Sequence, residues 1–348
     1  MDDVLIEKKK PFFPIIPQLM EYLDENRRLT KLHINYDDLL RFRDYTSIFD
    51  KHGNDTLWLN VYYAHNEFAD LEANLNKVYT LLHSDGDTSV LPYLKVDSVE
   101  YCTFGNSQPF RIRVRNVLND NYTNYYIKRA DASRVYGLEL EDIISNNRIN
   151  FLLHEDTLIE EHILGIPGDV FIAEKLPHCS ELEKAQIAKE FVKFNERCFI
   201  GLLGDMRSYN YVVIPIHDFD QVVYRIRPID FDQQSYEGKI EVYEPYRFKE
   251  NRSMVQMVMQ KFKPHSIEQY RKEVRSAIVK RILSDMDRFN HLMRVARADN
   301  IAPIEHVEQL RKALKARTYI TGFDFCKTMG DVIDAGFRFT IKNYQNVY

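Results

Sequence analysis

Three oxygen-bearing side chains flank two strand-like runs in the central part of the chain. Asp205 and Asn210 lie five positions apart in a polar loop that leads into the run Tyr211–Ile216. A second run, Val222–Ile229, ends directly before Asp230. If the two runs form a hairpin, these side chains meet at its mouth. Carboxylate and amide oxygens suit a hard cation such as Mg2+, and phosphoryl transfer depends mainly on positioning and charge neutralisation. Such a constellation can hold a divalent cation and orient a hydroxyl.

The motif around these residues resembles that of a known fold. The run DMRSYN, which begins at Asp205, is followed by a strand and then by IDFD, which contains Asp230. This order resembles the catalytic loop and metal-binding segment of protein-kinase-like folds, with the aminoglycoside and choline phosphotransferase branch as the most similar. The resemblance implies that Asp205 is the catalytic base and that Asn210 and Asp230 bind Mg2+. It also implies that Arg207 meets the transferred phosphate.

Two positions depart from the family pattern. Leu203 stands where these families keep a His, and Asp232 stands where protein kinases keep a Gly. Small-molecule kinases often show the second change. A run of the form DxxxxN is common by chance and is usually a turn. The strand and the IDFD segment that follow it favour the catalytic interpretation.

Upstream of the motif, the pattern predicts strands at Val99–Phe104, Phe110–Val117 and Asn124–Arg129, the first two joined by a turn at Gly105. In the resembling lobe these are the first three strands, and Lys128 grips the nucleotide phosphates. The alternative for Lys128 is a surface lysine on an edge strand. Gly105 is the only glycine of the predicted phosphate-covering loop, so its backbone approaches phosphates less freely than a glycine-rich loop does.

A helix is predicted from Ser133 to about Asn146. Kinase-like folds place here a Glu that holds the strand lysine, so the resemblance makes Glu141 or Glu139 the partner of Lys128. An exposed helix carboxylate is the ordinary alternative for either residue.

A second hairpin is predicted from Thr157–Leu164 and Val170–Leu176, because the intervening Ile166-Pro-Gly-Asp169 has the form of a type II turn with Gly at a positive φ. By analogy with the fold, this hairpin delivers the hinge between two lobes. Glu174 and Leu176 in that hinge would pair through their backbone with the adenine edge of ATP.

Apolar periodicity predicts helices in most of the remaining chain. A helix of about six turns leads directly into the Asp205 loop, which is the order of elements in a kinase C-lobe. The predicted helices span residues 17–28, 36–49, 65–83, 181–202, 253–262, 266–298, 303–317 and 324–335, and residues 56–63 form a strand.

Composition limits the classes of function. The 348 residues carry 47 basic and 52 acidic side chains, a net charge of −5 that offers no support for nucleic-acid binding. Four cysteines without CxxC pairing predict reduced, mostly buried thiols. No run is apolar enough to span a bilayer and no signal-peptide core is present, so we expect a cytoplasmic protein without membrane contact. HExxH, GxSxG, Walker A and nicotinamide fingerprints are absent.

These patterns predict an α+β chain, and the resemblance implies a bilobal protein-kinase-like fold. The expected parts are an N-terminal α/β extension at residues 1–95, an antiparallel-sheet N-lobe at 96–176 and a mainly helical C-lobe at 177–348. The expected function is an ATP- and Mg2+-dependent phosphotransferase that moves the γ-phosphate to a hydroxyl of a small molecule or protein. The alternatives are a pseudokinase that serves as a nucleotide- or partner-binding scaffold, and a structural α+β protein with an accidental motif.

Overall fold

The computed structural model describes residues 10–31, 34–218 and 221–344. The chain forms two compact units, each assembled from segments that are separate in the sequence. The sheet unit comprises Pro14–Asp131 and Ile149–His162. The helical unit comprises Ala132–Arg148, Ile163–Tyr348 and the described part of Met1–Phe13.

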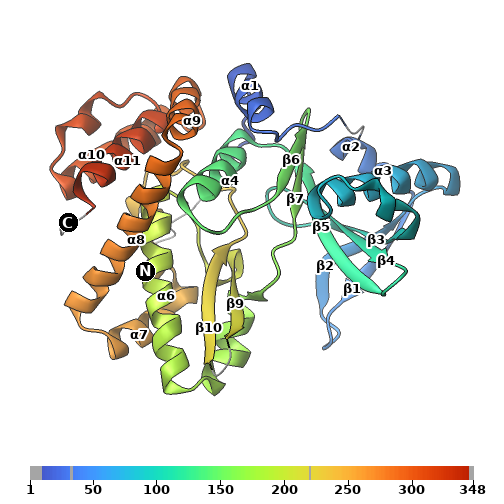
Figure 1. The fold of residues 1–348 in the computed structure, drawn as a ribbon, viewed down its shortest axis with the longest axis horizontal. Helices are drawn as coiled ribbons and strands as arrows, with labels where there is room; N and C mark the ends of the chain where they lie inside the picture. Colours follow the sequence, from blue (N-terminus) through green and yellow to red (C-terminus); the bar gives the residue numbers. More distant parts are fainter. Residues whose placement is uncertain (1–9, 32–33, 219–220, 345–348) are drawn as a thin grey trace. The chain divides into compact units, whose positions relative to one another are not determined.

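The sheet unit is dominated by an antiparallel sheet of seven strands in the order β1-β2-β3-β4-β5-β7-β6 (Figure 1). Its elements are α1 (Pro17–Glu25), α2 (Tyr36–Leu39), β1 (Asp44–Phe49), β2 (Asp55–Tyr62), α3 (His65–His83), η1 (Thr88–Tyr93), β3 (Leu94–Cys102), β4 (Phe110–Asn116), β5 (Asn121–Arg129), β6 (Phe151–His154) and β7 (Thr157–Glu161).

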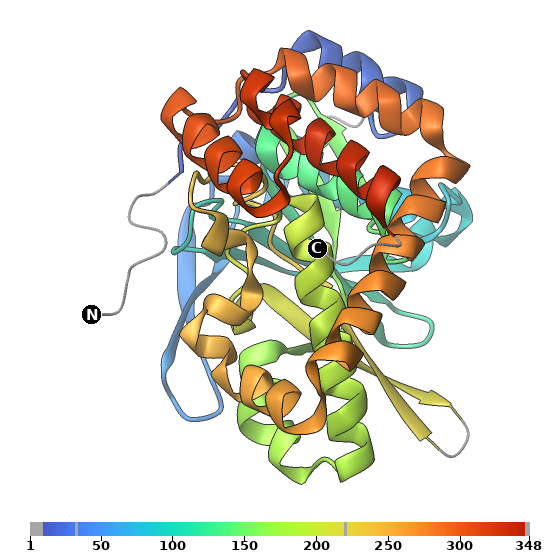
Figure 2. The same ribbon diagram turned by 90° about the vertical axis from the view of Figure 1, so that its left-hand side faces the viewer.

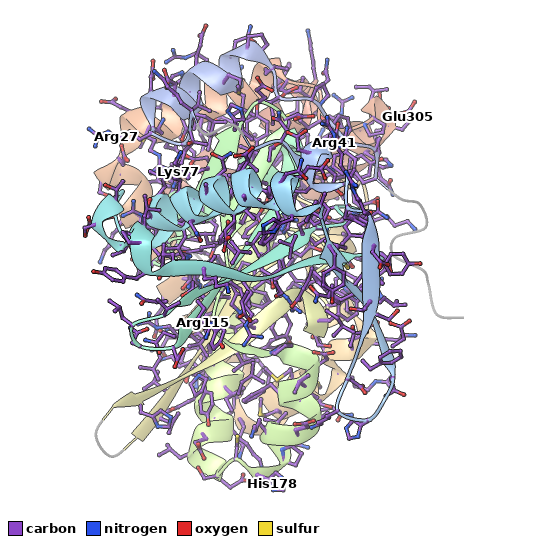
Figure 3. The ribbon with its side chains drawn as sticks, turned by 90° about the vertical axis from the view of Figure 1, so that its right-hand side faces the viewer. Arg27, Arg41, Lys77, Arg115, His178 and Glu305 are labelled. Atoms are coloured by element: carbon purple, nitrogen blue, oxygen red, sulfur yellow. The ribbon has the colours of Figure 1, made fainter. Side chains whose placement is uncertain are left out.

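Strand β4 shows how the sheet buries one face. Successive strand residues point to opposite faces, and the run FRIRVRN alternates apolar residues with arginines. Phe110 and Ile112 lie fully buried in the core that α3 covers, whereas Arg113 remains half exposed. Figure 3 shows Lys77 on α3 and Arg115 on β4. The alternation therefore fixes which side of the sheet packs against α3.

The helical unit combines a small sheet in the order β10-β9-β8 with most of the helices. Its elements are α4 (Ala132–Ile144), β8 (Ile166–Pro167), α5 (Gly168–Val170), η2 (Phe171–Lys175), η3 (Leu176–His178), α6 (Glu181–Gly201), η4 (Ser208–Asn210), β9 (Tyr211–Asp218), β10 (Gln221–Pro228), η5 (Ile240–Tyr243), η6 (Pro245–Arg247), η7 (Lys249–Asn251), α7 (Arg252–Lys261), α8 (Pro264–Ser284), α9 (Met286–Ala298), α10 (Ile304–Thr318), η8 (Thr321–Phe325) and α11 (Met329–Asn343).

Helix α6 is the scaffold of this unit. It begins with a capping box in which Ser180 and Glu183 satisfy each other's backbone N–H groups. Its apolar side packs against α7, α8 and β10, and Figure 2 shows α8 running alongside it. The helix ends at Gly201, and Leu202 closes it in the left-handed conformation at φ 50°. The chain thus leaves α6 at a defined angle into the loop that carries Asp205.

The predicted mixed α+β class is confirmed, with one large antiparallel sheet and many helices. The predicted helix at 65–83, the long helix into the Asp205 loop and the hairpin around Gly105 are also present. All four cysteines are free thiols, and three of them are buried. Within the described residues, no helix has the length and apolar character needed to cross a membrane.

The predicted helix at 36–49 is wrong over its second half, which forms β1. Its residues Tyr45, Thr46 and Ile48 are aromatic or β-branched and favour a strand. Strand β1 pairs with β2 around a turn in which Asp50 accepts hydrogen bonds from the backbone N–H groups of His52 and Asn54. Strands β1 and β2 join the same sheet as β3, so the chain does not divide at residue 95 as predicted.

The predicted hairpin at 157–176 is also wrong. Strand β7 pairs with β5 and β6, whereas Ile166–Pro167 pairs with β9. Gly168 then opens a helical segment rather than occupying a turn at positive φ, since only Gly53, Gly86 and Gly105 have positive φ among the described glycines. A Cβ at Gly168 would lie 2.3 Å from the Tyr211 ring, so this close approach explains the glycine.

Two further boundaries differ from the prediction. The helix expected over 266–298 divides at Asp285 into α8 and α9. The helix α4 belongs to the helical unit although it precedes the predicted boundary at residue 176.

Candidate functional site

Backbone hydrogen bonds fix the path of the loop that follows α6. The N–H of Gly204 donates to the carbonyl of Gln233 at 3.1 Å, and the N–H of Ser235 donates to the carbonyl of Leu202 at 2.8 Å. A Cβ at Gly204 would lie 2.9 Å from the same Gln233 carbonyl, so a larger residue would separate the two chain segments. The segment after β10 is thereby joined to the start of the Asp205 loop.

Asp205 itself adopts a left-handed backbone at φ 58°. Its N–H donates to the carbonyl of Val242 at 3.1 Å, and its carbonyl accepts from the Asn210 side chain at 2.7 Å. Its carboxylate accepts from Arg207 Nε at 2.7 Å. Left-handed non-glycine residues carry backbone strain and are concentrated at functional sites. The loop therefore imposes both the conformation and the direction of this carboxylate.

Arg207 connects the loop to the segment before α7. Its guanidinium donates to Glu250 at 3.0 Å and lies 5.1 Å from the centre of the Phe248 ring. Asn251, which is fully buried, donates to the carbonyl of Met206 at 2.9 Å. These contacts hold Arg207 beside Asp205 rather than free in solvent.

The carboxylates that follow β10 are held by a residue of α4. Arg134 is 2% exposed, and its Nη1 lies 2.8 Å from Asp230 Oδ1 and 2.5 Å from Asp232 Oδ1. The N–H of Asp232 also donates to Asp230 Oδ1 at 3.1 Å. Neither Arg134 nor Glu250 was predicted as a site residue. A single Arg in a helix and a single Glu in a short 3-10 helix carry no sequence signal, and both reach the site only through tertiary packing.

The structure brings the predicted acidic and amide residues together at the mouth of the β9–β10 hairpin. The N–H of Ile229 donates to the carbonyl of Asn210 at 3.0 Å, which aligns the two chain segments next to Asp230. The negative charge of Asp230 contributes to raising the pKa of Asp205.

Burial raises the pKa of Asp205 to about 6, although Arg207 acts in the opposite direction. Asp230 and Glu250 raise this pKa further through their charges. We expect the carboxyl carbon of Asp205 to titrate near pH 6 in a 13C NMR experiment. Because Arg207 stabilises the charged form, Arg207→Met should raise the midpoint, whereas Glu250→Gln should lower it. A midpoint near 3.8 in the wild type, the ordinary value for Asp, would contradict this environment.

The donor set fits part of a Mg2+ site. The carboxylate of Asp230 and the amide oxygen of Asn210 are hard ligands, and Mg2+ commonly takes its other ligands from phosphates and water. No group of three or more His, Cys, Asp or Glu side chains suited to a metal occurs among the residues described here.

The ion pair of Lys128 differs from the expected one. Lys128 lies on β5 and its Nζ is 2.7 Å from Glu160 on the adjacent strand β7, both side chains being buried. Glu139 accepts a hydrogen bond from Arg288 at 2.6 Å, and Glu141 accepts one from Asn147. The carboxylate that pairs with Lys128 therefore lies on the neighbouring strand of the same sheet, because residues 128 and 160 belong to paired strands.

The remaining predicted nucleotide contacts divide by location. Gly105 lies in the β3–β4 loop of the sheet unit at φ 81°. Glu174 and Leu176 belong to the helical unit, in the helical segment that replaces the expected strand. The backbone N–H of Leu176 donates to the carbonyl of Phe171 within that segment. The extended hinge expected at these two residues is therefore not formed.

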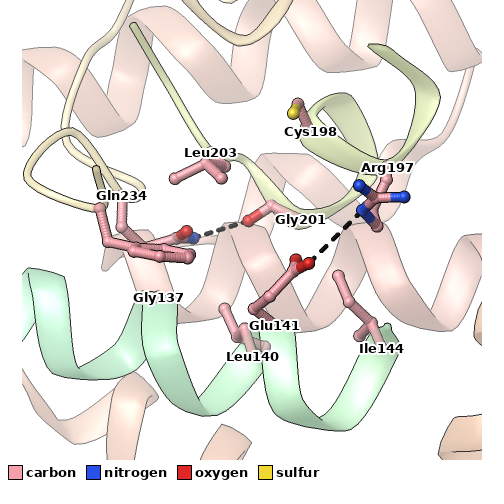
Figure 4. Close-up of a pocket in the computed structure, with 10 residues that line it drawn as sticks. Gly137, Leu140, Glu141, Ile144, Arg197, Cys198, Gly201, Leu203 and Gln234 are labelled. Carbon is pink, nitrogen blue, oxygen red and sulfur yellow. Dashed lines mark hydrogen bonds and ion pairs between the residues drawn. The ribbon is translucent and has the colours of Figure 1, made fainter. Parts of the chain in front are cut away.

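A small cavity of about 10 Å³ lies behind the Asp205 loop, between α4 and α6 (Figure 4). Glu141 and Arg197 face each other there at 3.6 Å, and Gln234 donates to the carbonyl of Gly201 at 2.6 Å. Its size corresponds to about one water molecule, so it has no room for a substrate.

No protein-family model matches the chain, and a search of curated proteins finds no significant match.

Proposed function

We propose that this protein is an ATP- and Mg2+-dependent phosphotransferase with a bilobal, protein-kinase-like fold. In this proposal the helical unit supplies the catalytic residue Asp205 and the metal ligands Asn210 and Asp230. The acceptor is a hydroxyl of a small molecule or protein.

The observation that carries the proposal is the gathering of Asp205, Asn210 and Asp230 at one end of a hairpin. Their spacing follows the kinase-like motif, and the hydrogen bond between Ile229 and Asn210 aligns the two segments that bear them. A pKa of about 6 leaves Asp205 ionised at neutral pH and able to accept a proton.

The residues of this chain would act as follows. The ionised carboxylate of Asp205 orients an acceptor hydroxyl and takes its proton as the oxygen attacks the γ-phosphorus and ADP departs. Arg207, whose Nε is 2.7 Å from that carboxylate, would meet the transferred phosphoryl group as a cation. Mg2+ bound by Asn210 and Asp230 would neutralise charge on the phosphate oxygens.

Nucleotide binding gives the most direct test. A ligand that binds only the folded state stabilises it by RT ln(1 + [L]/Kd), about 2.7 kcal/mol at a hundredfold excess over Kd. We expect ATP with Mg2+ to raise the unfolding temperature of the wild type. Asp230→Asn should lose the metal-dependent part of this shift because it removes a metal ligand.

Asp324→Asn is the matched control, since Asp324 is an exposed residue that pairs with Lys315 on α10. It should keep the full response to Mg2+ and ATP. A wild type that no nucleotide stabilises, with or without Mg2+, would rule out the phosphotransferase.

One observation favours the alternative of a pseudokinase scaffold. In this structure Arg207 engages Asp205, and Arg134 engages Asp230. A scaffold would retain nucleotide binding but transfer no phosphate to any hydroxyl acceptor, including water. Release of inorganic phosphate from ATP that Asp205→Asn abolishes would favour the enzyme.

A further inference from the structure

Helix α4 is fastened to the segment that carries Asp230. Besides the Arg134 contacts, the Ser133 hydroxyl donates to the carbonyl of Gln234 at 2.5 Å. A Cβ at Gly137 would lie 2.9 Å from the Phe231 ring, so the helix approaches this segment as closely as a glycine permits. Three positions on the first turns of α4 therefore contact residues 230–234.

The guanidinium of Arg134 is buried within this contact. Its side chain is 2% exposed, and that of Asp232 is 13% exposed, whereas that of Asp230 is 36% exposed. The most accessible of the three groups is thus the predicted metal ligand. A planar guanidinium can bind two carboxylates at once and fix their orientation, which a lysine ammonium does less well.

We infer that Arg134 is a positioning residue for the Mg2+ site, which it serves by fixing the orientation of the Asp230 carboxylate. The inference rests on the proposed function. Asp232 shares the same nitrogen of Arg134 and donates its own N–H to Asp230, so the three groups form one unit. Residues that orient metal ligands commonly change metal affinity by about 10- to 100-fold when they are replaced.

The same unit extends to the catalytic loop. Gln234 and Ser235 bind the carbonyls of Gly201 and Leu202, and Gln233 accepts from Gly204. A shift of the 230–235 segment would therefore also move the start of the Asp205 loop. Helix α4 thus supports the metal ligand directly and the base indirectly.

The test compares Arg134→Lys with Arg281→Lys in the full-length protein. Arg281 also grips α4, through the carbonyls of Asp142 and Ile143 at the opposite end of the helix. Calorimetric titration of Mn2+ into each protein with saturating ADP measures metal affinity without turnover. We expect about a tenfold weaker Mn2+ affinity in Arg134→Lys and wild-type affinity in Arg281→Lys, with ADP binding in EDTA unchanged in both.

Equal loss of Mn2+ affinity in the two variants would overturn the inference, because it would show only that α4 stabilises the fold. Unchanged or tighter affinity in Arg134→Lys would overturn it as well. If Arg134→Lys does not fold, Asp232→Asn removes the second carboxylate charge and should still weaken Mn2+ binding. A wild type that binds no Mn2+ with ADP would instead refute the proposed function and this role with it.

Discussion

Replacing Asp205 by Asn should lower the rate of phosphoryl transfer by a factor of about 10² to 10⁴, the contribution typical of a positioned general base. The side-chain amide introduced at this position keeps an oxygen for Arg207 Nε, so the loop can retain its hydrogen bond while losing the proton acceptor. Because Asn210 and Asp230 are untouched, we expect Mg2+-dependent nucleotide binding to survive. The measurement pairs ATP turnover with calorimetric binding.

The same variant makes a stability prediction that does not depend on activity. Burial raises the pKa of Asp205 to about 6 in the folded protein, against an ordinary 3.8. The raised value means that the folded state favours the protonated carboxyl, so this contribution to stability is full below about pH 3.8 and is lost as pH rises through 6. At pH 7 the wild type has lost it.

Asp205→Asn should therefore be more stable than the wild type at pH 7, by at most about 3 kcal/mol, and the difference should vanish near pH 4. Urea unfolding at the two pH values measures it. Asp324→Asn serves as the control, because it makes the same Asp-to-Asn change at an exposed position on η8, outside the candidate site. Full turnover in Asp205→Asn would exclude a base role for Asp205. A lower free energy of unfolding than the wild type at pH 7 would show that burial does not disfavour the charged Asp205 carboxylate.

The hairpin that carries the site can be predicted from local sequence, but the long-range side-chain contacts within the site cannot. The spacing of Asp205 and Asn210 and the apolar runs after them are local features, and the structure has the hairpin they predict. The Arg134 contact with Asp230 joins residues 96 positions apart, and the Arg207 contact with Glu250 joins residues 43 apart. Pairing over such distances depends on how the helices pack, which periodicity does not encode.

The incorrect strand at 170–176 has a related cause. A Pro-Gly pair fits a tight turn, but the same Gly is also required wherever another chain segment approaches closely. At Gly168 the approach is that of Tyr211 and of the Ser208 carbonyl oxygen, which would lie 2.4 Å from a Cβ at this position, next to the candidate site. Only the tertiary contact separates the two explanations.

Gly330→Ala should be the most destabilising substitution of a glycine in the C-terminal helices. Gly330 lies in the first turn of α11, where a Cβ would be 2.1 Å from the carbonyl oxygen of Ala296 and 2.5 Å from the N of Arg297. Both atoms are backbone, so the clash cannot be relieved by turning a side chain. Overpacking of this kind costs about 1–3 kcal/mol and more where backbone must move, and we expect about 3 kcal/mol.

Gly336→Ala on the same helix is the matched control. No atom lies within 4 Å of a Cβ at Gly336, and its φ is not positive, so alanine should stabilise the helix by about 0.5–1 kcal/mol. In urea unfolding, a lower free energy of unfolding for Gly330→Ala and a higher one for Gly336→Ala would show that α11 packs on the end of α9 through Gly330. Loss of stability in both variants would mean that helix α11 tolerates no added methyl group, and a gain in both would mean that Gly330 does not touch α9. Because Thr328 also donates to the carbonyl of Arg297 at 3.2 Å, the start of α11 depends on this close approach for its hydrogen bonding as well as its packing.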